Sequence, residues 1–231
     1  MTSIASNLQA VIRTIIEAAD AAQRHVENIT LLAVSKTFSA DAVREAHVAG
    51  QRAFGENYVQ EALDKITALR DLPLEWHFIG PIQSNKTRVI AENFCWVHSV
   101  DRLKIAERLS AQRPHNLPPL NVCIQVNVSG EDSKSGVAPG EVSELAQALV
   151  KLPRLKLRGL MAIPAPAEGL AAQRKPFAEL RELMHRLNIQ GLELDTLSMG
   201  MSHDLVAAVL EGATIVRVGS AIFGQRNYGE K

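Results

Sequence analysis

The sequence has little cysteine and no net charge. Cys95 and Cys123 are its only cysteines, and no CxxC pair occurs. A disulfide framework or a thiolate zinc site is therefore not expected, and a reducing cytosol suits this cysteine usage. The 25 Lys and Arg residues balance 25 Asp and Glu residues. No global field is present that would attract nucleic acid or an anionic membrane.

Long apolar runs are also missing. No stretch approaches the roughly 20 residues that cross a bilayer, and the N-terminal segment lacks the basic and apolar regions of a signal peptide. We therefore expect a cytoplasmic protein that binds neither membrane nor nucleic acid. Hydrophobic residues make up 46% of the 231 residues, enough for one large core. No linker divides the chain, so residues 1–231 should form a single domain.

Strand and helix patterns alternate along the chain. A first helix is expected over residues 2–25, with one apolar stripe made by Ile4, Leu8, Val11, Ile12, Ile15 and Ile16. The expected strands cover residues 29–36, 52–55, 75–79, 95–99, 120–128, 156–163, 195–199 and 214–218. The helices that follow them are expected over residues 39–50, 58–69, 84–93, 101–111, 139–150, 173–188 and 202–211, with a short helical turn from Ser220.

This alternation predicts an α/β protein with a parallel sheet. Eight strand–helix units in about 200 residues fit a single (β/α)8 TIM barrel with an extra N-terminal helix. The competing fold is an open doubly wound sheet, which usually has a glycine-rich turn after its first strand. Here the first strand ends in Ser35-Lys36-Thr37, so we favour the barrel.

Lys36 ends the first apolar run, and in a barrel the C-terminal ends of the strands build the site. Lysine forms Schiff bases with carbonyl compounds, including pyridoxal phosphate (PLP). The alternative interpretation is a solvated lysine at a strand end, since lysine is mostly exposed. The other strand ends must decide between the two.

The ends of the seventh and eighth strands are rich in small residues. Ser198, Gly200 and Ser202 lie at the end of one strand or just after it, and Gly219 and Ser220 follow the other. Small residues allow backbone N–H groups to approach an anion, and loops after strands seven and eight often hold phosphate in barrels. Alternatively, Ser202 is an ordinary helix N-cap and the glycines are ordinary turns.

Arg217 lies inside an otherwise apolar strand, where a buried guanidinium needs a partner. That partner is either a ligand or an acid in an ion pair, such as Glu56. His77 and His98 also lie near strand ends, and we interpret them as hydrogen-bonded structural histidines. A lysine, a phosphate cradle and an inward arginine are together what a PLP site needs.

These residues lie in motifs that resemble the pyridoxal phosphate homeostasis proteins. The matching segments are LLAVSK (31–36), FGENYVQEA (54–62), WHFIGPIQSNK (76–86), SKSG (133–136), RGLMAIP (158–164), LSMGMSHD (197–204) and VRVGSAIFG (216–224). They span nearly the whole chain in order, so their combined specificity far exceeds that of any one motif.

The resemblance implies a fold-type III barrel like the N-terminal domain of alanine racemase, with PLP bound to Lys36 as a Schiff base. It implies that Arg217 lies near the pyridine nitrogen and that Asn57 lines the pocket. It implies phosphate contacts from a set of loop residues, namely Ser198, Met199, Gly200, Ser202, Gly219 and Ser220. Lys134 matches a position discussed as a secondary cofactor-handling lysine.

The resemblance also implies a carrier or buffer in intracellular PLP homeostasis with no catalytic activity. Racemases of this fold type add a second domain with a tyrosine base and dimerise, whereas this chain ends after the eighth unit, and Tyr58 and Tyr228 are its only tyrosines. We therefore expect a monomer whose partners are PLP and PLP-dependent apo-enzymes. The alternatives are a PLP-dependent racemase or lyase and, third, a cofactor-free aldolase that uses the same lysine.

Overall fold

The computed structural model describes residues 3–130 and 135–225. Its parallel strands close into one barrel, in which each strand pairs with the next and the last pairs with the first. The predicted TIM barrel is therefore confirmed. The strands are β1 (Thr30–Val34), β2 (Ala53–Glu56), β3 (Glu75–Phe78), β4 (Trp96–Val100), β5 (Leu120–Gln125), β6 (Leu155–Met161), β7 (Thr196–Ser198) and β8 (Ile215–Val218).

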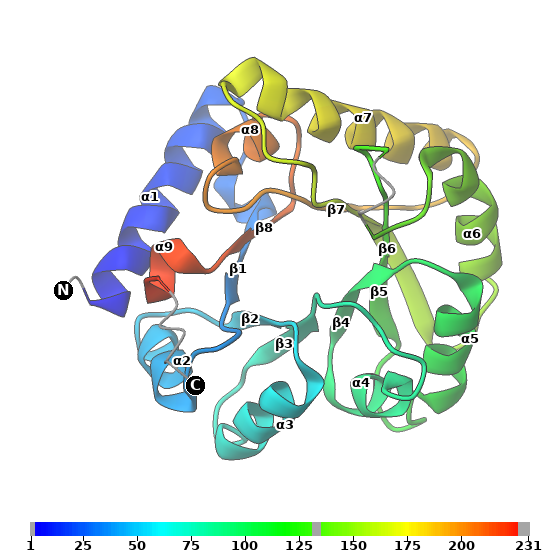
Figure 1. Cartoon of the computed structure of the whole chain (residues 1–231), viewed down its shortest axis with the longest axis horizontal. Coiled ribbons are helices and arrows are strands. Elements are labelled where there is room, and N and C mark those ends of the chain that lie inside the picture. Colours follow the sequence, from blue (N-terminus) through cyan, green and yellow to red (C-terminus); the bar gives the residue numbers. More distant parts are fainter. Residues whose placement is uncertain (1–2, 131–134, 226–231) are drawn as a thin grey trace.

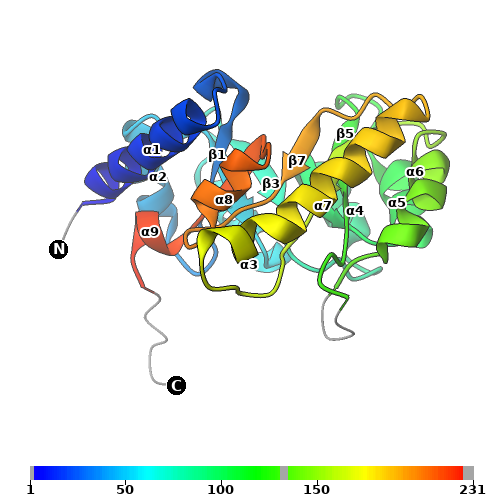
Figure 2. The ribbon, with the colours of Figure 1, turned by 90° about the horizontal axis from the view of Figure 1, so that it is seen from above.

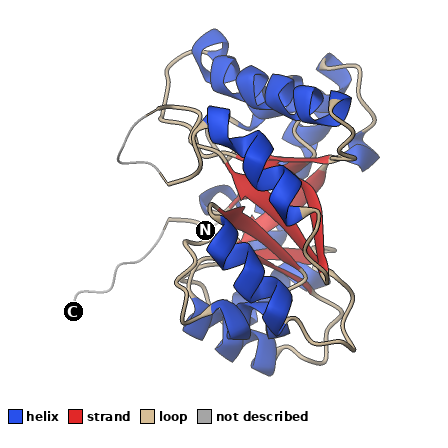
Figure 3. Cartoon of the chain, turned by 90° about the vertical axis from the view of Figure 1, so that its right-hand side faces the viewer, coloured by secondary structure: helices blue, strands red, loops and turns tan. Residues whose placement is uncertain are grey.

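Helices connect the strands on the outside of the barrel (Figure 1), and the strands form an inner layer between them (Figure 3). The α-helices are α1 (Ile4–Ala21), α2 (Ala40–Val48), α3 (Val59–Ala68), α4 (Thr87–Asn93), α5 (Leu103–Gln112), α6 (Val142–Leu149), α7 (Leu170–Ile189), α8 (Leu205–Leu210) and α9 (Ser220–Phe223). Short 3-10 helices cover Val26–Asn28 and Pro139–Glu141. Within the described residues, no helix combines the length and apolar character that a bilayer crossing requires.

Helix α1 is the extra helix expected before the first strand. It lies along α8 and α9 (Figure 2) and buries Leu8, Val11 and Ile15. Ile12 and Ile16 were also expected on the buried stripe, but they are 39% and 40% exposed. Each follows a buried residue by one position, which turns it about 100° around the helix axis and away from the barrel.

Several predicted boundaries were wrong where strands give way to loops. The fifth strand ends at Gln125 instead of 128, because beyond it Val126 forms only an isolated bridge with Val137. The helix expected over 202–211 begins at Leu205. The N–H of Met201 donates to Asp204 Oδ1 at 2.5 Å, so a turn precedes this helix and Ser202 is not its N-cap.

Along each strand, alternate side chains face either the space between strands and helices or the interior of the barrel. One large apolar cluster fills the space between strands and helices. A smaller cluster belongs to the strands and consists of Leu32, Ala53, Trp96, Cys123, Met161 and Ile215. Polar side chains of the strands lie on the same face of the sheet as this smaller cluster. Some of them belong to the candidate site.

Strands β6 and β7 approach closely at Gly159, which is in register with Thr196. A Cβ atom on residue 159 would overlap the Thr196 carbonyl group. We predict that Gly159→Ala lowers the free energy of unfolding by about 1–3 kcal/mol, because backbone atoms cannot move aside without disturbing the barrel. Urea denaturation measures this. Gly140→Ala is the control, since an added Cβ there meets nothing within 4 Å; equal stability of the two variants would contradict the close approach.

Candidate functional site

One hollow gathers residues from the C-terminal ends of several strands. Its volume is about 210 Å³. The residues that line it are Val34, Lys36, Asn57, Ile79, Ile163, Met201, Ser202, His203, Arg217, Gly219 and Ser220. Six of the residues expected at a cofactor site are therefore brought together, namely Lys36, Asn57, Ser202, Arg217, Gly219 and Ser220.

Lys36 projects from a tight turn immediately after β1. The N–H of Phe38 donates to the Ser35 carbonyl at 3.0 Å, so Lys36 is the second residue of a four-residue turn. Thr37, the third residue, has φ +69°, which matches a type II turn. Lys36 is partly buried, which differs from the solvated lysine that was the alternative interpretation.

Asn57 brings a polar group that lacks a partner. Its side-chain Oδ1 is buried and accepts no hydrogen bond from the described residues. The backbone of Asn57 passes so close to Gly80 that any side chain at residue 80 would overlap it. The hydroxyl of Ser99 donates to the Gly80 carbonyl at 2.5 Å and holds this crossing in place. Since buried polar atoms are normally paired, Asn57 Oδ1 is suited to a donor on a ligand.

Arg217 is 4% exposed, yet its guanidinium reaches the hollow. Nη1 donates to Ser198 Oγ and Nη2 donates to the Ala162 carbonyl, each at 2.8 Å. Burial lowers the pKa of Arg217 to about 10, so it remains a cation at neutral pH. An ion pair with Glu56 was the alternative, and it is wrong: the Glu56 carboxylate is bonded to Ser35 and Lys65.

A chain of hydrogen-bonded side chains, buried except for Glu75 at its end, extends from Arg217 to the opposite end of the strands. The Ser198 hydroxyl lies 2.7 Å from His98 Nδ1, His98 Nε2 lies 2.9 Å from His77 Nδ1, and His77 Nε2 lies 2.7 Å from Glu75 Oε1. The interpretation of both histidines as hydrogen-bonded structural residues agrees with these contacts.

The ends of the chain assign its direction. A carboxylate only accepts, so His77 donates to Glu75; with neutral rings, His98 then donates to His77 and Ser198 donates to His98. The Ser198 oxygen is thereby left to accept from Arg217. Burial lowers the pKa of both histidines, and that of His98 lies well below its usual value. Three side chains, those of Ser198, His98 and His77, thus connect the buried Arg217 cation with the carboxylate of Glu75.

Three of the residues expected at the site do not line this hollow. Ser198, Met199 and Gly200 are not among the residues that line the hollow, and the side chains of Ser198 and Met199 are fully buried. The Ser198 hydroxyl is hydrogen-bonded to His98 and Arg217. Lys134 lies outside the residues that the structure describes.

Five lining residues were not expected from the sequence, namely Val34, Ile79, Ile163, Met201 and His203. Val34 is the last residue of β1 and the others follow strand ends, which is the signal that could have identified them. No cluster of three or more His, Cys, Asp or Glu side chains suited to a metal ion occurs in residues 3–130 and 135–225.

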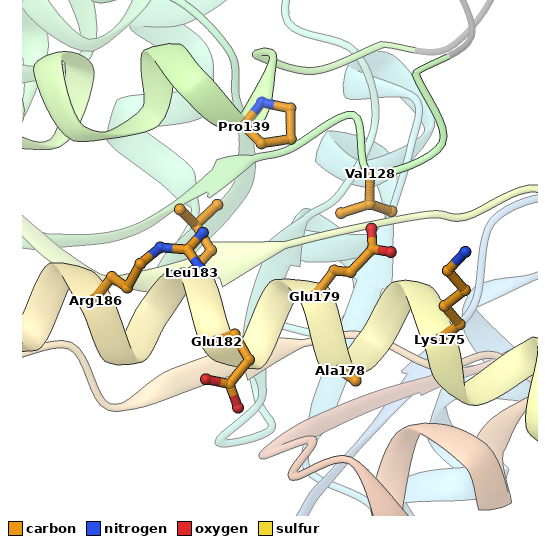
Figure 4. Close-up of a pocket in the computed structure, with 8 residues that line it drawn as sticks. All are labelled: Val128, Pro139, Lys175, Ala178, Glu179, Glu182, Leu183 and Arg186. Atoms are coloured by element: carbon orange, nitrogen blue, oxygen red, sulfur yellow. The ribbon is translucent and has the colours of Figure 1, made fainter.

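A larger hollow of about 460 Å³ lies on the outside of the barrel (Figure 4). It is bounded by α7, with Lys175, Glu179 and Arg186, and by Val128 and Pro139 across from the helix. None of the expected site residues contributes to it. Size alone therefore does not identify the site, which is defined by the strand ends.

Comparisons with known proteins identify the family of this chain. The family model described as alanine racemase, N-terminal domain matches residues 9–227. A Pseudomonas aeruginosa protein named pyridoxal phosphate homeostasis protein is 66% identical over 99% of this chain and 98% of its own. An Escherichia coli protein of the same name is 54% identical, with both chains covered completely.

Solved structures give the same result. PipY of Synechococcus elongatus, solved with PLP bound, is 39% identical, has a TM-score of 0.82, and matches 96% of this chain and 100% of its own. Alanine racemase of Corynebacterium glutamicum has a TM-score of 0.70 over 99% of this chain and 62% of its own. At 20% identity, this second likeness shows the fold alone.

The buried histidines predict a pH-dependent stability. Their lowered pKa values mean that the unfolded chain binds more protons than the folded chain below about pH 6.5, so stability should fall as the pH decreases from 7 to 5. His98→Gln should make this fall shallower, by up to about 1.4 kcal/mol per pH unit. Urea denaturation at several pH values measures it.

His115→Gln is the matched control for this experiment, because it removes an exposed imidazole. A pH dependence that is identical in His98→Gln and in His115→Gln would show that His98 does not remain neutral in the folded protein.

Proposed function

Because this chain belongs to the alanine racemase N-terminal domain family, and within it to the pyridoxal phosphate homeostasis proteins, we propose that it binds PLP and carries or buffers it in PLP homeostasis. The observation that carries this proposal is that Lys36 and Arg217 line one hollow together with Gly219 and Ser220. An amine, a guanidinium and small residues match the aldehyde, the pyridine nitrogen and the phosphate of PLP.

Lys36 supplies the covalent attachment. Its deprotonated Nζ condenses with the aldehyde of PLP and releases one water, which gives a Schiff base that hydrolysis can reverse. A reversible bond suits a protein that must also release its cofactor.

We assign the phosphate group of PLP to the loops after β7 and β8. Ser202, Gly219 and Ser220 line the hollow and offer hydroxyl and backbone N–H donors. A Cβ on Gly219 would lie 3.2 Å from the Val34 carbonyl, so the absence of a side chain lets β1 and this loop approach. In this proposal, Ser198 orients Arg217, because its hydroxyl oxygen accepts a hydrogen bond from the guanidinium.

Arg217 also supports a role without catalysis. Arginine does not give up its proton, so it donates to an unprotonated pyridine nitrogen. An unprotonated ring withdraws electrons weakly and is a poor sink for the carbanions that PLP enzymes form. We therefore propose a binding protein that acts as a cytoplasmic monomer and delivers PLP to apo-enzymes. Delivery is tested by incubating the PLP-loaded protein with an apo-enzyme and then measuring the activity that this enzyme gains.

Lys36→Ala should abolish covalent binding. Wild-type protein mixed with PLP should show a Schiff-base absorption band that borohydride makes permanent, with the label on Lys36. The variant should show only the spectrum of free PLP, because no amine remains at that position. Lys175→Ala, on the outer surface of α7, should keep the band. A wild-type protein without any such band would overturn the proposed function.

The phosphate contacts can be tested by charge. Ser220→Asp should weaken the affinity for PLP by about tenfold or more through like-charge repulsion. It should leave the affinity for pyridoxal, which has no phosphate, near the wild-type value. Ser143→Asp, on α6 and outside the hollow, controls for the added charge. Absorbance titration measures all of these affinities; an equal loss for both ligands would place the phosphate elsewhere.

Catalysis is tested by turnover. The loaded protein is incubated with individual amino acids, and racemised or cleaved products are measured over many equivalents. We expect no turnover. Sustained turnover that disappears in Lys36→Ala would make the protein an enzyme, and His203, which lines the hollow, would be the first residue to examine as a second base.

A further inference from the structure

Lys65 contacts the backbone beside Lys36 from outside the hollow. It lies in α3, is 4% exposed, and its Nζ donates to the Ser35 carbonyl at 2.6 Å. That carbonyl begins the turn from which Lys36 projects, and it also accepts the N–H of Phe38. One ammonium group is thus bonded directly to the peptide group that precedes Lys36.

Two carboxylates surround the same ammonium group. Lys65 Nζ donates to Glu56 Oε1 at 2.8 Å and to Glu61 Oε1 at 2.6 Å. Its three donors are therefore all used. Each acceptor in turn holds a neighbour of Lys36, since Glu56 Oε1 accepts from the Ser35 hydroxyl and Glu61 Oε1 accepts from the Thr37 N–H, both at 2.6 Å.

The turn needs such support. Thr37 has φ +69°, a conformation that is unusual for residues other than glycine and strained for a β-branched one. Strained backbone persists where its surroundings hold it, and such sites often belong to functional regions. The bond from the Thr37 N–H to Glu61 fixes the strained residue, and Lys65 fixes Glu61. The residues on both sides of Lys36 are thereby anchored to one buried cation.

Stability alone is a poor explanation for this cluster. Burying charges carries a large desolvation penalty, and apolar replacements of buried ion pairs are often as stable. Glu56 is fully buried and its Oε2 has no hydrogen-bond partner among the described residues. Burial raises the pKa of Glu56, a sign that the carboxylate is held at a disfavoured position. Charged groups that are buried despite this desolvation penalty indicate a function. Here they contact the turn that holds Lys36.

We propose that Lys65 is a positioning residue for Lys36. With Glu56 and Glu61, it holds the turn so that the Lys36 amine meets the aldehyde of the cofactor at the correct place and angle. Lys65 is not among the residues that line the hollow. The inference rests on the proposed function, because it gives Lys36 a geometry that only a covalent partner requires.

The test compares two variants with the wild type. Lys65→Met removes the ammonium group but leaves two carboxylates near one another, so it should be less stable. Lys65→Met/Glu56→Gln removes the buried charge as well, which should restore much of the thermal stability. Both should form the Schiff base about tenfold or more slowly than the wild type, since small displacements of a reacting group can cost about a hundredfold in rate.

Arg174→Met is the matched control. Arg174 Nε donates to the buried carboxylate of Glu211 at 2.6 Å, at the end of α8 and outside the hollow. This variant should lose stability, as Lys65→Met does, but keep the wild-type rate and affinity. Rate and affinity are measured from the Schiff-base absorption band after mixing with PLP, and melting temperature is measured on the same samples without PLP.

The outcomes separate the two proposals. A double variant with wild-type melting temperature and a slowed, weakened Schiff base supports positioning by Lys65. Wild-type rate and affinity in that variant would overturn it, while leaving PLP binding by Lys36 intact. If both Lys65 variants fail to fold, Glu61→Ala serves instead, because it removes the anchor of Thr37 at a partly exposed residue; wild-type behaviour in Glu61→Ala would also overturn the inference. Absence of any band in the wild type would refute the proposed function itself.

Discussion

The pairing of β1 with β8 is the interaction on which the site depends. These strands are the first and last of the barrel, and their register places Leu32 beside Arg217 and Ala33 beside Val218. Continuing this register brings the turn that holds Lys36 to the loop that holds Gly219 and Ser220. Residues separated by most of the chain meet because the sheet closes, and an open sheet would leave them at opposite edges.

The buried cations of Arg217 and Lys65 are both provided with hydrogen-bond partners. Arg217 is connected through Ser198, His98 and His77 to Glu75. Lys65 is enclosed by the carboxylates of Glu56 and Glu61. The two networks act on different parts of the same site, since one orients the guanidinium and the other holds the turn of the lysine. Buried polar networks that are nearly complete specify a unique geometry.

Much of the fold was predictable from the local pattern of apolar residues. Apolar runs and helical stripes are consequences of burial on one or both faces, so the order of strands and helices could be read from the chain. The position of Lys36 at a strand end followed in the same way. Boundaries were less predictable: Asp204 begins a helix that Ser202 was expected to begin, because a side-chain bond to the Met201 N–H sets the start. Such bonds depend on geometry within a few ångströms.

The sequence by itself determined the class of fold, the residues at the strand ends and the chemistry that they offer, because these depend on periodicity and on residue type. Only the tertiary structure decided which of those residues share the hollow. It placed the Ser198 hydroxyl in a hydrogen bond with Arg217, and it placed the Lys65 ammonium group against the carbonyl of the peptide before Lys36. The physical reason is that a hydrogen bond is made at about 3 Å between groups of any separation in sequence. The local sequence pattern therefore does not predict such a contact.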